Sequence, residues 1–373
     1  MTTMSNLPEE LVREILSRVP LTSLRQLRCT CRTWNALSKT QVFGKKEARN
    51  RFLGFTVMNN RLCSLRLELQ GLLNEGELVH QSTKQIGKFD GTKMYKVRHC
   101  DGLLLCVHKN CNNIVVWNPY LSQTRCIPTR CDFGLNDVFG FGYANKNRNH
   151  KILRVLRGRF IRLALYDLKS DSWRVLDIEP YINLDIWESG VSLKGNTYFV
   201  AQQYAVDVLY CFDFTTERFR PPLQFPKEAE YVVLSCVRDE KLAVLYQLEK
   251  TMEIWITTKI EHDDVSWSMF LKVETTPLNG FPDDFSNDTD AETFFIDEEK
   301  KVAVVSDVWE DEPTKDETCY SQTAHIIGQD GYLKSTTCPK YRVEEALVFS
   351  SYVPSLVQVG INQRSKRKHK DCL

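Results

Sequence analysis

The sequence predicts an α+β multidomain protein, in which a small N-terminal helical module precedes an all-β domain of the β-propeller type. Three observations predict this fold class. Apolar residues recur at helical spacing in the first forty residues, and short alternating apolar runs dominate from residue 52 onward. In addition, a strand–turn–strand unit recurs at intervals of about 40–50 residues. A chain of 373 residues is long enough for two domains.

The first helix is expected to begin at Pro8, because the missing N–H of proline costs nothing at a first helical position. Glu9 and Glu10 then complement the positive end of the helix dipole. Pro20 is expected to end the helix. The apolar face of this helix is formed by Leu11, Ile15, Leu16 and Val19.

A second helix is expected after a cap at Thr22 or Ser23, and a third helical turn follows it. Their apolar residues are Leu24, Leu27, Cys31, Trp34 and Leu37. About forty residues cannot close a core around so many large side chains. We therefore expect another protein to cover part of this surface, the alternative being a helical hairpin packed on the chain's own second domain.

The same stretch resembles an F-box, the motif that docks the Skp-type adaptor of cullin-based ubiquitin ligases. Its second half, from Thr22 to Leu37, is similar to the large plant family that carries an F-box-associated interaction domain. Thr30 departs from the pattern, since an aliphatic residue is more usual there. The resemblance implies that the following residues form the module's core and its adaptor-facing surface: Leu7, Pro8, Leu11, Ile15, Leu16, Val19, Pro20, Leu24, Leu27, Cys31, Trp34 and Leu37.

The β region begins with a predicted hairpin of residues 52–58 and 62–69, turned at Asn59-Asn60. Aromatic anchors then recur 49, 46 and 43 residues apart, at Trp117, Tyr166, Phe212 and Trp255. Each anchor is followed by a polar turn and a second strand. The spacing predicts a kelch-like β-propeller of about six units over residues 52–360, and it favours this fold over a β-sandwich.

Predicted hairpins alternate with these anchors, and their turns lie near Asp101-Gly102, Lys194-Gly195, Asp239-Glu240 and Glu298-Glu299. A last hairpin, Ala346–Ser350 with Leu356–Val359, is expected to close the ring. The segments Asp101–Leu104, Trp117–Pro119 and Phe139–Tyr143 resemble the F-box-associated domain of the plant family. The predicted organisation is a helical module at 1–45, a linker at 46–51, a β domain at 52–360 and a basic disordered tail at 361–373.

Composition and motifs argue against several kinds of chemistry. The net charge of +1 indicates no general attraction to nucleic acid or to membranes. Without a recognisable signal peptide, the 13 cysteines are expected to be reduced in a cytoplasmic and/or nuclear protein. Five residues cluster without a recognised zinc spacing, so core cysteines are favoured there: His99, Cys100, Cys106, His108 and Cys111.

The acidic stretch Asp283–Asp290 lacks the central glycine and final glutamate of a calcium loop. Phe139–Gly142 lacks the third glycine of a dinucleotide-binding loop. We therefore expect no cofactor, no metal ion and no catalytic residue in this chain.

The resemblance implies that the protein is the substrate-recognition subunit of a Skp–cullin–F-box ubiquitin ligase. Its partners would be the Skp-type adaptor, through it the cullin, and an unknown substrate protein bound by the β domain. We expect no nucleic acid and no membrane partner. Two alternatives stay open: a kelch-like binding module that acts outside a ligase, and a propeller enzyme, for which the sequence supplies no acid/base pair.

Overall fold

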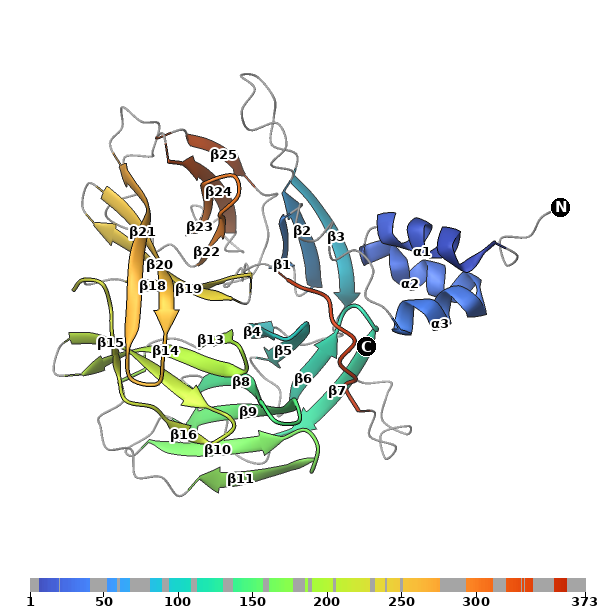
Figure 1. The fold of residues 1–373 in the computed structure, drawn as a ribbon, viewed down its shortest axis with the longest axis horizontal. Helices are drawn as coiled ribbons and strands as arrows, with labels where there is room; N and C mark the ends of the chain where they lie inside the picture. Colours follow the sequence, from blue (N-terminus) through green and yellow to red (C-terminus); the bar gives the residue numbers. More distant parts are fainter. Residues whose placement is uncertain are drawn as a thin grey trace, which may run out of the picture. The chain divides into compact units, whose positions relative to one another are not determined.

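The computed structural model (Figure 1) describes residues 7–19, 21–40, 52–58, 61–67, 81–88, 94–108, 113–129, 137–156, 161–176, 185–186, 190–203, 206–228, 232–238, 240–248, 251–275, 293–310, 320–329, 331, 333–337 and 352–360. The chain divides into two compact units. The first contains the helices, the sheets up to residue 129 and the segment 352–360. The second contains the sheets between residues 130 and 350.

Three short helices form the N-terminal module of the first unit: α1 (Glu9–Arg18), α2 (Leu21–Thr30) and α3 (Arg32–Thr40). Pro8 is the residue before α1 and its carbonyl accepts the N–H of Val12 at 3.1 Å, so the helix begins one residue later than predicted. The predicted cap at Thr22 or Ser23 is wrong. Helix α2 already begins at Leu21, which leaves no place for a non-helical cap at either position.

The helices pack through a small apolar cluster. Val12 and Leu16 of α1 and Trp34 and Leu37 of α3 are buried in it. Tyr120, which follows strand β6 (Asn113–Asn118), is buried in the same cluster. The excess apolar surface of the helices is therefore covered in part by the chain's own β region, the arrangement expected of a hairpin packed on its own domain.

Two antiparallel sheets complete the first unit. Strands β1–β3 form one, and the register from Phe52↔Leu67 to Met58↔Arg61 confirms the predicted first hairpin, whose turn lies outside the described residues. Strands β4–β7 form the other, in sequence order. Their bounds are β1 (Phe52–Met58), β2 (Arg61–Leu67), β3 (Gln81–Lys88), β4 (Met94–Cys100), β5 (Leu103–His108), β6 (Asn113–Asn118) and β7 (Gln123–Pro128).

The second unit contains four more sheets, each with neighbouring strands antiparallel and close in the sequence. The first two consist of β8 (Val138–Ala144), β9 (Asn149–Leu156), β10 (Arg162–Asp167), β11 (Ser172–Leu176), then β12 (Asp185–Ile186), β13 (Val191–Leu193), β14 (Asn196–Gln203), β15 (Val206–Asp213), β16 (Arg218–Phe219) and β17 (Leu223–Gln224). The last two consist of β18 (Val232–Val237), β19 (Lys241–Leu248), β20 (Thr251–Ile260), β21 (Val265–Glu274), then β22 (Thr293–Asp297), β23 (Val302–Glu310), β24 (Tyr320–Gly328) and β25 (Leu333–Thr337).

The repeats predicted from the sequence correspond to fixed positions in these sheets. The aromatic anchors Trp117, Tyr166, Phe212 and Trp255 lie on β6, β10, β15 and β20, the third principal strand of each sheet. The alternating hairpins are the first and second strands, for example β18 with β19. In the described residues, five sheets of four or more strands thus repeat as the blades of a β-propeller fold, where the sequence predicted about six units. A further sheet, β1–β3, has three strands.

A shared turn explains why the unit repeats. Asn118, Asp167 and Asp213 each end the third principal strand of a sheet and accept backbone N–H groups from two or three residues further on at 2.8–3.3 Å. Asp297, which ends the first strand of its sheet, accepts the N–H groups of Glu299 and Lys300 in the same way. Such a side chain replaces the ladder hydrogen bonds that the backbone loses when it turns. The polar turns singled out in the sequence are therefore strand terminators.

The predicted last hairpin is wrong within the described residues. Residues 352–360 form no strand, because polar side chains and loop backbone, rather than a strand ladder, satisfy the segment. Residues 346–350, the tail and the acidic stretch at 283–290 lie outside the described residues. Cys100 and Cys106 are buried, and burial raises the pKa of the Cys106 thiol to about 12, as expected of a core cysteine.

Candidate functional site

The helix α1 exposes an apolar pair. Leu11 and Ile15 are 49% and 38% exposed, and because they are four residues apart they lie on one face of the helix. The charged residues beside them pair along the helix: Arg13 Nε donates to Glu9 at 2.9 Å and Arg18 pairs with Glu14. This face therefore presents two aliphatic side chains among charges that are already paired.

The structure divides the twelve predicted F-box residues into groups that the sequence left together. Buried in the helical cluster are Leu16, Trp34 and Leu37. Partly buried at its edge are Leu7, Val19, Leu27 and Cys31. Exposed are Pro8, Leu11 and Ile15. The side chains of Pro20 and Leu24 lie outside the described residues.

Sequence reasoning missed Val12, which is only 2% exposed and belongs to the buried cluster. The available signal was its spacing, since Val12 and Leu16 form a second i, i+4 stripe beside that of Leu11 and Ile15. With two adjacent apolar stripes on one helix, only the position of the neighbouring elements decides which stripe is buried.

A polar contact joins the helices to the β6–β7 turn. The guanidinium of Arg28 lies over the ring of Tyr120 at 4.4 Å and donates to the Tyr120 carbonyl. Arg28 Nε donates to Ser38 Oγ at 2.8 Å, and the Tyr120 hydroxyl donates to the Ser38 carbonyl at 3.0 Å. Burial lowers the pKa of Arg28. Each of the three residues thus contacts both of the others.

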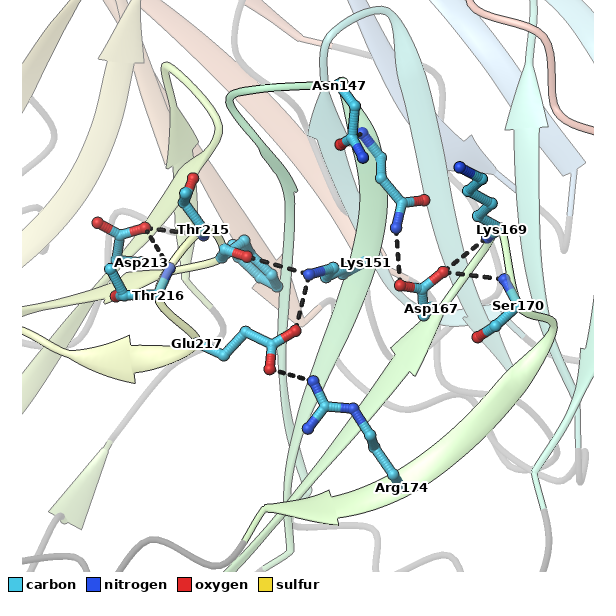
Figure 2. Close-up of polar contacts among 12 residues, drawn as sticks. Asn147, Lys151, Asp167, Lys169, Ser170, Arg174, Asp213, Thr215, Thr216 and Glu217 are labelled. Carbon is cyan, nitrogen blue, oxygen red and sulfur yellow. Dashed lines mark hydrogen bonds and ion pairs between the residues drawn. The ribbon is translucent and has the colours of Figure 1, made fainter.

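A second polar cluster crosslinks turns within the second unit (Figure 2). Lys151 of β9 donates to the Phe214 carbonyl at 3.2 Å and to Glu217 at 2.7 Å. The other carboxylate oxygen of Glu217 accepts from Arg174 of β11. Asn149 donates to Asp167 at 2.7 Å on the neighbouring strand. The cluster therefore ties the end of one sheet to a turn of the next.

The electrostatics of this cluster indicate a structural role. Burial raises the pKa of Glu217, but hydrogen bonds from Arg174 and Lys151 lower it by more, so the net shift of the pKa is downward. Burial likewise raises the pKa of Asp167, but the N–H groups of its turn lower it by more. Both carboxylates are ionised acceptors at neutral pH, whereas a general acid needs the opposite shift.

Within the described part of the chain, no group of three or more His, Cys, Asp or Glu residues is placed to hold a metal ion. Among the same residues, no helix is long and apolar enough to cross a membrane.

Comparison with known proteins matches both parts of the chain. The family model of the F-box domain matches residues 4–46, and that of the F-box associated beta propeller domain matches residues 53–359. An F-box/kelch-repeat protein of Arabidopsis thaliana is 47% identical over 100% of both chains. Two F-box proteins of the same plant are 50% and 51% identical over 96% of this chain and 100% of theirs.

Proposed function

This chain belongs to the family of plant F-box proteins with an F-box associated β-propeller domain, and on that basis we propose that it is the substrate-recognition subunit of a Skp–cullin–F-box ubiquitin ligase. The helices dock the Skp-type adaptor, which connects to the cullin, and the β domain binds the protein to be modified. The chain itself makes and breaks no bond. It contributes proximity, because holding a target near the conjugating enzyme raises the effective concentration of its lysines.

The observation that carries this proposal is the exposed pair Leu11 and Ile15 on α1. Two aliphatic side chains one turn apart on a helix form a small docking surface, and their burial by a partner is favourable. In this assignment Leu11, Ile15 and Pro8 face the adaptor, whereas Leu16, Trp34 and Leu37 form the core that supports them. The module comprises residues 1–45, and residues 46–51 link it to a β domain at 52–360.

The topology of the β4–β7 sheet supports a proposal for where the target protein binds. The helices contact the turn between β6 and β7. Because β6 is antiparallel to both β5 and β7, the last residues of β5 and β7 lie beside the start of β6, at the end of the sheet opposite to the β6–β7 turn. We assign the target protein to that opposite end of the sheet, since the helices occupy the end that carries the β6–β7 turn.

The test is binding of the purified full-length chain to a Skp-type adaptor, compared with the variant Leu11→Asp/Ile15→Asp. Burying the exposed half of two aliphatic side chains is worth about 2 kcal/mol, so the double variant should bind at least ~30-fold more weakly. Val175→Asp is the control, because Val175 is 72% exposed on β11, remote in sequence from the helices. It should bind as the unmodified chain does.

Circular dichroism and cooperative melting check that the double variant is folded, as expected for exposed positions. A double variant that binds the adaptor as tightly as the unmodified chain would exclude this docking face. A full-length chain that does not bind the adaptor at all would exclude the ligase role and favour a binding module that acts alone.

A further inference from the structure

The segment 352–360 lies far from the helices in the sequence but beside them in the first unit. It runs along the β6–β7 turn, where Asn118 Nδ2 donates to the carbonyls of Ser355 and Val357 at 3.1 and 2.8 Å. Gln123 contacts it from β7, accepting the N–H of Val359 at 3.1 Å and donating to Gln358 at 2.6 Å. Side chains at the end of β6 and the start of β7 thus bind backbone carbonyl and N–H groups of this segment.

The beginning of the segment reaches the first turn of the same sheet. Tyr352 is 3% exposed, and its hydroxyl donates to the Gly102 carbonyl at 3.3 Å. Ser355 Oγ donates to the Asp101 carbonyl at 2.6 Å. A Cβ atom on Gly102 would lie 2.5 Å from Ser355 Oγ and 2.7 Å from its backbone nitrogen, so the two backbones meet with no space between them.

The same segment also packs against the apolar cluster that the helices share with Tyr120. Leu356 packs against the cluster that contains Leu16, Trp34 and Tyr120. Arg28 also contacts Tyr120, since its guanidinium lies over the Tyr120 ring and its Nε donates to Ser38. The segment therefore contacts the sheet through hydrogen bonds and, through an apolar side chain, the cluster in which the helices meet Tyr120.

We propose that residues 352–360 form a clasp that holds the three-helix module against the β4–β7 sheet, with Leu356, Tyr120 and Arg28 as positioning residues. The clasp itself rests on contacts within this chain. Its consequence rests on the proposed function: the orientation of the bound adaptor relative to the sheet is set by a segment from the opposite end of the sequence. Because effective concentration depends on geometry, the clasp restricts which lysines of a target are reached.

Hydrogen exchange tests the clasp without any partner, by comparing the full-length protein with two shortened chains. A chain ending at residue 351 lacks the clasp, and a chain ending at residue 360 keeps it and lacks only the tail. We expect backbone amides of α3 to exchange at least tenfold faster in the shorter chain and at the unmodified rate in the longer one. Amides of β19 and β20, in the second unit, report that the rest of the chain remains folded.

Single substitutions keep the proposal testable if the shorter chain does not fold. Leu356→Asn should accelerate exchange in α3 at least tenfold, and the conservative Leu356→Met should restore protection, since only the apolar contact matters. Unchanged α3 exchange in both the shorter chain and Leu356→Asn would overturn the clasp. Adaptor binding by the unmodified chain separates the two proposals. If that chain binds no adaptor while the shorter chain and Leu356→Asn still lose α3 protection, the clasp stands and the ligase role does not.

Discussion

Replacing Gly102 by alanine tests a close backbone approach in the first unit. Gly102 has φ +74° in the turn between β4 and β5, and Gly331 has φ +80° in the turn between β24 and β25. A Cβ atom on Gly102 would lie 2.5–2.7 Å from atoms of Ser355. Around Gly331, the described residues place no atom within 4 Å of such a Cβ. The two glycines therefore share a backbone conformation and differ in their surroundings.

The expected costs follow from that difference. A left-handed conformation costs an alanine about 1–2 kcal/mol, and both variants lose this amount. Gly102→Ala must also displace Ser355, which adds about 1–3 kcal/mol of overpacking. It further weakens the 2.6 Å hydrogen bond from Ser355 to the Asp101 carbonyl, worth about 0.5–1.5 kcal/mol. We expect a loss of about 2.5–6.5 kcal/mol for Gly102→Ala and about 1–2 kcal/mol for Gly331→Ala.

Urea unfolding of the two full-length variants measures both losses, and hydrogen exchange of residues 352–360 locates the first. Faster exchange in that segment is expected for Gly102→Ala only. Equal losses of stability in the two variants, with unchanged exchange at 352–360, would refute the packing of Ser355 on Gly102. The control makes the test specific, because it contains the same backbone strain without the contact.

Two further predictions concern buried carboxylates. Glu253 is 8% exposed, and although burial raises its pKa, hydrogen bonds from Lys227 and the Trp255 indole lower it to about 2. A pKa depressed in the folded state stabilises the protein above the unfolded value of about 4.3, and this stabilisation, up to about 3 kcal/mol, is lost as pH falls toward 2. The urea midpoint should therefore fall less steeply from pH 5 to pH 2 in Glu253→Gln than in the unmodified protein. The control Glu261→Gln, at an exposed carboxylate, should keep the slope of the unmodified protein. Equal slopes in Glu253→Gln and the unmodified protein would contradict this prediction. Asp213 bonds Arg220 Nη2 at 2.5 Å and caps its own turn, so Asp213→Ala should cost about 2–4 kcal/mol in urea unfolding and Asp213→Asn, which keeps the cap, about half as much. Identical losses in the two variants would show that the cap contributes nothing.

Much of this protein could be predicted from the sequence because the signals are local. Helical spacing predicted α1 and α3, and the recurrence of strand, polar turn and aromatic anchor predicted strands at Trp117 and Tyr166, which lie on β6 and β10. These features depend on side chains a few residues apart, such as an aspartate that caps its own turn. The F-box resemblance, confirmed by both family models, rests on the same kind of short-range pattern.

The tertiary structure alone decided which apolar stripe of α1 is buried. Val12 and Leu11 are neighbours with the same hydrophobic character, and contact with Trp34 and Tyr120 separates a buried residue from an exposed one. Arg28 and Tyr120 are 92 residues apart. Leu356 begins a run, Leu356–Val359, that the sequence predicts as a strand, yet the run forms no strand and lies against the β6–β7 turn. Contacts between such distant residues depend on how separate elements pack, and no periodicity within one element encodes them.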